Sequence, residues 1–160
     1  MDAQLYICSA AEVDPAGRVH ALGVGTDVLP EEHGPITVVA RIVLDEEDAV
    51  RPHRTRLRLL DRHGSPVLTQ GGPSPDGPGI LPPTPQPIEL PGEVPPVVPS
   101  ADALPPWGWV SAPLVYMIGP GTLPGPGLFH WEFAVDGEVL DSAPIFVLSA
   151  AQMQQMQGQQ

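Results

Sequence analysis

Cysteine, lysine and asparagine are scarce or missing in this 160-residue chain, and the first two shortages exclude classes of structure and partner. The single cysteine, Cys8, cannot form a disulfide within the chain, so cysteine usage gives no sign of an oxidising compartment. Lysine is absent, and the seven basic residues are arginines that all precede His63. The formal net charge is -12. Such a surface repels phosphate backbones and anionic headgroups, so we expect neither nucleic acid nor membrane as a partner.

Long apolar runs and targeting signals are missing as well. No stretch approaches the roughly 18 apolar residues that a membrane-spanning helix requires. The first residues, Met1 to Gln4, lack the basic and apolar regions of a secretory signal. We therefore expect the chain in the cytoplasm, or in a particle assembled there, such as a virion.

Motifs for catalysis or for a tightly bound cofactor are not found. The five histidines show no metal-ligand spacing, and neither G-x-S-x-G nor S-x-x-K occurs. Gly23-Val24-Gly25 lacks the third glycine and the helix of a dinucleotide loop. Cys8 lies in an apolar segment and is expected to be a small buried hydrophobe. The sequence predicts no enzyme and no cofactor.

What the chain does contain is a series of short apolar segments separated by turns. Residues 4–12 and 18–29, joined by an Asp-Pro-Ala-Gly turn, predict an antiparallel hairpin. Residues 36–44 are apolar on both faces except for Arg41, which predicts a central strand covered on two sides. Residues 54–62 alternate arginine with leucine or threonine, which is typical of a half-buried strand.

The C-terminal half continues this pattern. Residues 109–118, 128–136 and 138–148 predict strands, and the Asp-Gly pair between the last two is a strong hairpin signal. About seven or eight strands without a long helix predict an all-β fold, an antiparallel β-sandwich of the Ig-like or jelly-roll kind. We expect residues 1–148 to form this single domain.

Two segments depart from the strand pattern. Residues 71–106 hold 13 prolines, which exclude a regular helix or a central strand and favour an extended insert. This insert is predicted to be either an arm that contacts a partner or a surface loop. Residues 149–160 form a glutamine-rich tail, where Ser149 is expected to cap a short helix. The partner-binding candidates in these segments are Pro83, Pro85, Pro87, Trp107, Trp109, Met153 and Met156.

Charged side chains gather in two places. The stripe Arg54, Arg56, Arg58 and Arg62 is predicted either to pair with acidic residues of neighbouring strands or to dock an acidic partner, including a second copy of the chain. The acidic cluster Asp45, Glu46, Glu47 and Asp48 is predicted to be a solvated turn, with calcium binding as the weaker alternative.

The two ends of the predicted domain resemble a known family. Residues 4–29 (QLYICSAAEVDPAGRVHALGVGTDVL) and 129–147 (FHWEFAVDGEVLDSAPIFV) are similar to the opening and closing strands of small uncharacterised proteins of actinobacteria and their phages. The similarity continues loosely through residues 58–67, whereas the proline insert and the tail depart from it. The resemblance implies a β-sandwich and no established activity.

These observations favour a non-enzymatic structural or interaction protein. We expect an accessory component of a larger assembly, such as a capsid-decorating or tail-associated protein of a phage particle, with protein partners or self-association. The alternative is a solitary cytoplasmic β-sandwich module that binds calcium or a small ligand, with Asp136 and Asp141 as further candidates. A hydrolase whose site is assembled from scattered histidines and aspartates is a third hypothesis.

Overall fold

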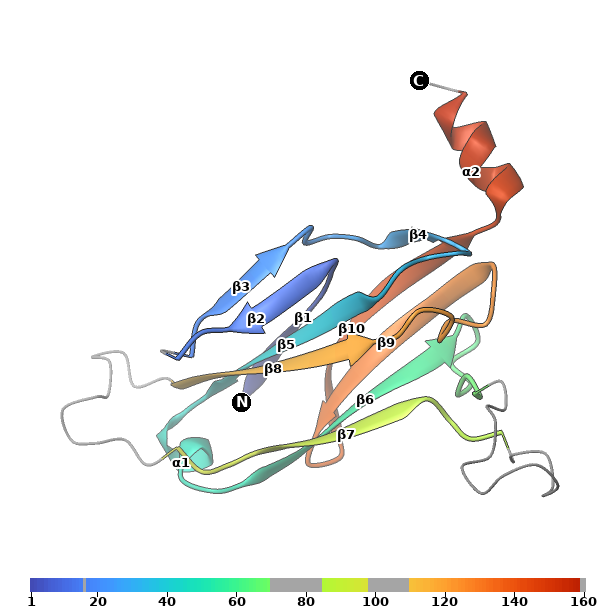
Figure 1. The fold of residues 1–160 in the computed structure, drawn as a ribbon. Coiled ribbons are helices and arrows are strands. Elements are labelled where there is room, and N and C mark those ends of the chain that lie inside the picture. Colours follow the sequence, from blue (N-terminus) through green and yellow to red (C-terminus); the bar gives the residue numbers. More distant parts are fainter. Residues whose placement is uncertain (16, 70–84, 98–109, 159–160) are drawn as a thin grey trace, which may run out of the picture.

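The computed structural model describes residues 1–15, 17–69, 85–97 and 110–158, and Figure 1 shows their arrangement. A three-stranded antiparallel sheet has the order β1-β5-β8, with β1 (Asp2–Cys8), β5 (Ile36–Leu44) and β8 (Val110–Ile118). A five-stranded sheet has the order β4-β10-β9-β6-β7, with β4 (Val28–Pro30), β6 (His53–Asp61), β7 (Glu89–Val94), β9 (Gly127–Val135) and β10 (Glu138–Leu148). The hairpin of β2 (Ala10–Val13) and β3 (Val19–Leu22) and the helices α1 (Glu46–Ala49) and α2 (Ala150–Gln157) complete the described elements.

The predicted all-β fold is confirmed. The antiparallel and mixed sheets curl around one core as a half-barrel, and the five-stranded sheet is mixed because β4 runs parallel to β10. Strands β1 and β10, which belong to different sheets, meet where the backbone N–H of Leu5 donates to Asp141 Oδ2 at 2.7 Å. The sheets are therefore joined along one side of the core.

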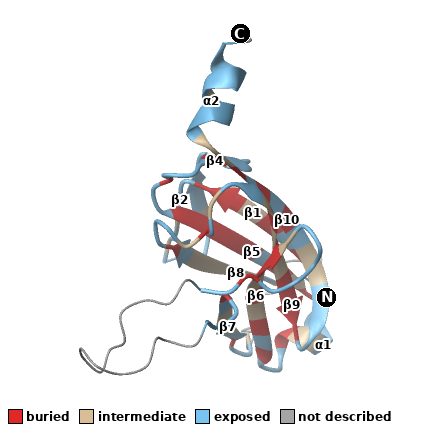
Figure 2. Cartoon of the chain, turned by 90° about the vertical axis from the view of Figure 1, so that its right-hand side faces the viewer, coloured by how far each residue is buried: buried red, intermediate tan, exposed pale blue. Residues whose placement is uncertain are grey.

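The core is built from alternating side chains of both sheets. Phe129, Trp131, Phe133 and Val135 of β9 all point inward, as period-two alternation requires. They pack with Leu57 and other apolar residues of the shared cluster. Each fully buried large side chain contributes about 1.5–3 kcal/mol to folding. Figure 2 shows this buried layer running along β5, β6 and β9.

Three local predictions are confirmed. Strand β5 is buried on both faces over most of its length, and Arg41 is its one exposed residue. Strand β6 alternates as expected, with Thr55, Leu57 and Leu59 buried. The turn between β9 and β10 places Asp136 and Gly137 at φ +50° and +89°, the left-handed conformation that an Asp-Gly hairpin turn requires.

The predicted N-terminal hairpin is only partly correct. Residues 10–13 and 19–22 do pair, whereas Asp2–Cys8 leaves the hairpin and pairs with β5. The reason is burial, since Leu5 and Ile7 enter the shared core from β1. The chain bends at Ser9, whose N–H donates to the Leu22 carbonyl at 3.0 Å. There the backbone packs so closely that a Cβ on Gly23 would lie 2.6 Å from Ser9 Oγ.

Part of the proline-rich insert belongs to a sheet. Residues 89–94 form β7, which pairs with β6 at the edge of the five-stranded sheet. An edge position tolerates Pro91 because one side of an edge strand needs no N–H donor. Pro87 lies beside Leu68 in an isolated antiparallel bridge. Pro83, Trp107 and Trp109 lie outside the described residues.

Helix α2 forms in the glutamine-rich tail with Ser149 as its cap, as predicted from the sequence. The Ser149 side chain accepts from the backbone of Gln152, and the Gln152 side chain accepts from the backbone N–H of Ser149, which makes a complete capping box. None of its residues is buried, and the helix projects from the end of β10 away from the sheets (Figures 1 and 2).

Candidate functional site

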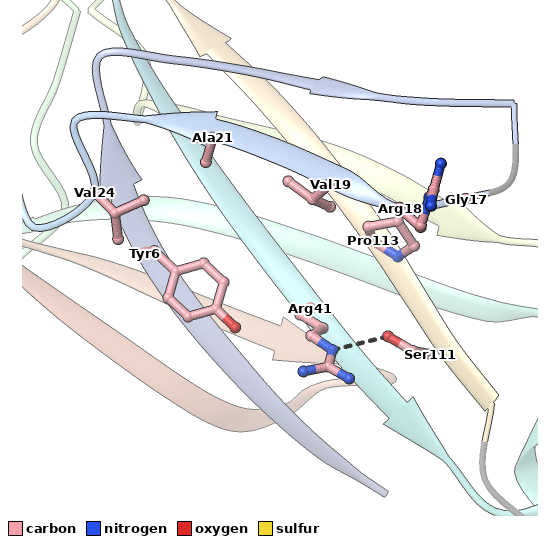
Figure 3. A pocket seen from close by; sticks show the side chains of 9 residues that line it. All are labelled: Tyr6, Gly17, Arg18, Val19, Ala21, Val24, Arg41, Ser111 and Pro113. Carbon is pink, nitrogen blue, oxygen red and sulfur yellow. Dashed lines mark hydrogen bonds between the residues drawn. The ribbon is translucent and has the colours of Figure 1, made fainter.

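A cleft lies between the β2–β3 hairpin and the outer face of the three-stranded sheet. Its volume is about 450 Å³, and Figure 3 shows its lining. The sheet contributes side chains from all three strands, and the hairpin covers them from the other side. The described lining residues are Tyr6, Gly17, Arg18, Val19, Ala21, Val24, Arg41, Ser111 and Pro113.

Arg41 is the principal charge on the floor of the cleft. Strand β5 places it opposite Gln4 of β1 and Pro113 of β8, on the face that points away from the core. Its Nε donates to Ser111 Oγ at 3.0 Å, the contact drawn in Figure 3. Within the described part of the chain, no carboxylate forms an ion pair with Arg41. Its two terminal amino groups therefore have no charged partner among these residues.

The second arginine of the cleft is already neutralised. Arg18 Nε lies 2.7 Å from Asp14 Oδ2, and the Arg18 backbone N–H donates to Asp14 Oδ1 at 2.9 Å. Asp14 Oδ2 also lies 3.2 Å from His20 Nε2. This cluster closes the hairpin turn next to the cleft. The net positive charge inside the cleft therefore comes from Arg41.

The remaining lining is apolar, with two hydroxyl groups. Val19, Ala21 and Val24 face the cleft from the hairpin side, and Pro113 lies on the sheet side. Tyr6 contributes its ring, and its hydroxyl donates to Gln4 Oε1 at 2.9 Å. No histidine, cysteine or carboxylate belongs to the described lining, so these residues contain no nucleophile paired with a base.

The arginine stripe lies on the opposite sheet, and two of its four arginines have an acidic neighbour. Arg58 Nε lies 2.6 Å from Glu132 Oε1, and Arg56 Nε lies 4.0 Å from Glu89 Oε1. Both acidic residues belong to neighbouring strands, which matches the cross-strand alternative. Arg54 is exposed on the same face, whereas Arg62 lies in the turn after β6 beside His63.

The acidic cluster caps and anchors α1. Asp45 accepts from the Asp48 backbone N–H at 2.9 Å, and Asp48 Oδ1 lies 2.6 Å from Arg51 Nη2. The hydrogen bond from Arg51 lowers the pKa of Asp48. Glu46 and Glu47 are exposed. Across the described ranges, no three histidine, cysteine, aspartate or glutamate side chains gather closely enough to hold a metal ion.

A buried histidine forms a second polar cluster that sequence reasoning missed. His53 is fully buried, with Nδ1 2.9 Å from Asp136 Oδ2 and Nε2 2.8 Å from the Asp48 carbonyl oxygen. The hydrogen bonds from His53 and the Arg54 backbone lower the pKa of Asp136. Asp136 therefore anchors its turn, and Asp141 is engaged by Leu5. The contacts of Asp136 with His53 and Arg54 join residues more than 80 positions apart, so local patterns gave no signal for them.

The cleft itself had one sequence signal. Arg41 interrupts the apolar run 36–44, and a lone charge in such a run marks an exposed position in a covered strand. Its neighbours Tyr6 and Ser111 had no comparable signal, because pairing of distant strands brings them there. Of the tail candidates, Met153 is partly exposed and Met156 is 54% exposed on α2, far from the cleft (Figure 1).

Together these features define an all-β protein with a hairpin-covered cleft. A model of a family of unknown function, DUF6941, matches residues 4–148, and the chain belongs to this family. No curated protein matches the chain. The predicted resemblance to an uncharacterised family is thereby confirmed. In the described ranges, neither helix is long and apolar enough to cross a membrane.

Proposed function

We propose that this protein is a non-enzymatic interaction protein that contacts a partner protein through its hairpin face. The hairpin face consists of β2, β3, the residues Gly23 and Val24 that follow β3, and the outward side chains of the three-stranded sheet. One observation carries the proposal, namely the large apolar side chains that this face exposes. Met117 is 83% exposed, Leu22 72% and Val24 59%. Exposed apolar groups that lie together are a common feature of protein interaction sites.

The strand register places Leu22 and Met117 at the same end of the three-stranded sheet. Met117 lies opposite Thr37, and Thr37 lies opposite Cys8 in the next strand. The following residue, Ser9, donates its N–H to the Leu22 carbonyl. Leu22 and Met117 therefore border the same end of the hairpin face. The apolar cleft continues this surface toward Arg41.

The sheet edges favour contact through side chains over contact by strand addition. Pro30, Pro91 and Pro113 lie in β4, β7 and β8, which are edge strands of the two sheets. Proline has no N–H to offer an incoming strand, and edge prolines oppose unwanted strand pairing. The fourth edge, β1, is partly occupied by Asp141.

Helix α2 supplies a second contact element in this proposal. It buries none of its own residues, and an eight-residue helix without tertiary packing is marginal in water. In this proposal a partner packs against Met153 and Met156 and thereby stabilises the helix. This is the contact that we predict from the sequence for these two methionines. The arginine stripe contributes less, because Arg56 and Arg58 already pair with glutamates of this chain.

The setting of the interaction belongs to the same proposal. We propose an accessory role in a larger assembly, such as a phage particle of actinobacterial origin, formed in the cytoplasm; the lack of catalytic motifs in the sequence is compatible with this role. A sandwich of the Ig-like or jelly-roll kind stays the prediction for the finer fold type. The second candidate function, a small-ligand module, is favoured by the cleft; Asp45 and Asp48 are engaged in the cap and in ion pairs.

Site-specific photocrosslinking tests the protein contact. The photoreactive residue p-benzoylphenylalanine replaces Leu22 or Met117 in the full chain, expressed in its source cells. We expect discrete higher-mass adducts from both positions after irradiation. The matched control is position 139, because Val139 is a 49% exposed apolar residue on β10 of the other sheet. Absence of adducts at 22 and 117, or equal adducts at 139, would overturn the proposal.

A further inference from the structure

We infer that the cleft beneath the hairpin is a binding site for a small organic carboxylate with an apolar body. This inference goes beyond the proposed protein contact and does not depend on it. Three observations carry it: the guanidinium of Arg41, which has no carboxylate partner among the described residues, the absence of acidic residues from the described lining, and the apolar walls.

The first step concerns charge. The chain contains 19 acidic and seven basic residues, yet two of those arginines line this one cleft. Asp14 neutralises Arg18, so one positive charge remains. One uncompensated guanidinium matches a monoanion and leaves a phosphate dianion undercompensated. Because the whole molecule is strongly acidic, it repels anions at long range, and the attraction must come from the local contact with Arg41.

The second step concerns geometry. Arg41 is held at Nε by Ser111, and this contact leaves the two terminal amino groups for a ligand. A carboxylate accepts two roughly parallel hydrogen bonds from a guanidinium fork, which fixes its orientation as well as its charge. The hydroxyl of Tyr6 donates to Gln4, so its oxygen still has acceptor capacity.

The third step concerns the ligand's body. A volume of about 450 Å³ lies within the range of small-molecule pockets, which combine apolar walls with a few polar groups. Val19, Ala21, Val24 and Pro113 supply such walls. A short aliphatic or aromatic group attached to the carboxylate covers these side chains while the charge meets Arg41. An anion without an apolar body, such as inorganic phosphate, leaves these apolar side chains exposed to water.

The test uses the purified full chain and amide chemical shifts measured during titration. The probes are phenylacetate, its neutral analogue phenylacetamide, and inorganic phosphate. We expect phenylacetate to give saturable shifts centred on Tyr6, Arg41 and Ser111. Phenylacetamide should bind at least about tenfold more weakly, because charged hydrogen bonds are the stronger ones. Phosphate should give no saturable shift at these residues.

Variants distinguish the loss of a specific binding site from a general loss of folded structure. Arg41→Gln should weaken phenylacetate binding about tenfold or more, whereas Arg41→Lys, which keeps the charge but loses the fork, should lie between. Ser111→Ala should weaken binding and Ser142→Ala, an exposed strand residue of the other sheet, should not. Circular dichroism and thermal melting confirm that each variant is folded.

Three results would overturn the inference. They are equal binding of phenylacetate and phenylacetamide, unchanged binding in folded Arg41→Gln, and shifts that lie away from the cleft. Stronger binding of phosphate than of phenylacetate would also overturn it, in favour of a general anion site. None of these outcomes bears on photocrosslinking at positions 22 and 117, so this inference and the proposed function can fail separately.

Discussion

At the scale of single residues, Asp136 links two distant segments, and no sequence pattern predicted this link. Its carboxylate accepts from the buried ring of His53 and from the Arg54 backbone N–H, at 2.9 Å in each case. Its own backbone lies at φ +50° and donates to the Arg54 carbonyl. One side chain therefore anchors the start of β6 to the β9–β10 turn.

Asp136→Asn isolates the contribution of this carboxylate. Asparagine also tolerates the left-handed conformation, so the turn backbone is preserved. We expect a loss of about 1–1.5 kcal/mol in the free energy of unfolding, the low end for hydrogen bonds to a charged group, because the Asp136 side chain is 37% exposed and water screens its charge. Urea denaturation at neutral pH measures it. The control is Asp27→Asn, an exposed aspartate whose side chain forms no hydrogen bond or ion pair with the described residues, which should change little.

The pH dependence of stability provides a second readout for the same variant. The pKa of Asp136 is lowered in the folded state, so its contribution is present above the pKa of the unfolded chain, near 4. It is lost as the pH falls through the lower, folded-state pKa. The difference in stability between wild type and Asp136→Asn should therefore shrink as the pH falls below about 4. A difference that stays constant down to low pH would contradict this assignment.

At the scale of elements, strands and helices contribute very unequally to stability. Strand β10 carries Ile145 and Val147 in the core and pairs with both β9 and β4. Helix α2, which follows it directly, buries nothing. The residues that stabilise the fold should therefore end with β10, and the fold should not require α2.

Removal of residues 149–160 tests this division. We expect the free energy of unfolding to change by less than about 0.5 kcal/mol, because exposed groups contribute little to folding. Ile145→Ala, a fully buried position on β10, should instead cost about 2–5 kcal/mol. Both values come from denaturant unfolding of the purified proteins. A truncated chain as unstable as Ile145→Ala would show that α2 packs on the body.

At the scale of the whole molecule, Cys8 reports whether the three-stranded sheet stays closed. It is fully buried, its thiol lies 3.4 Å from the Thr37 carbonyl oxygen, and it pairs β1 with β5. Burial raises the pKa of this thiol, so both access and thiolate formation are suppressed in the folded state.

Thiol labelling therefore measures opening of the fold. We expect Cys8 to react slowly with a maleimide in the native protein, and its rate to rise in step with urea unfolding. The comparison is a Cys8→Ala, Ser142→Cys double variant, whose exposed thiol should react at once. Rapid native labelling of Cys8 would mean that β1 separates from β5 without global unfolding.

Much of the fold was predictable because it depends on neighbours in sequence. The alternation in β6 and β9 and the Asp-Gly turn are local consequences of side-chain period and backbone conformation. The same holds for the Ser149 cap. The candidate site was far less predictable, since only Arg41 gave a signal and Tyr6 and Ser111 gave none.

The amino-acid sequence by itself determined that this protein is all-β, where most of its strands run, and that its surface is acidic. Only the tertiary structure decided that β1 leaves its hairpin for β5, that β7 closes an edge, and that Arg41 meets Ser111, 70 positions away. The physical reason is range. Alternation and turn chemistry act over a few residues, whereas strand partners are selected by burial of the complete core, which exists only once the chain has folded.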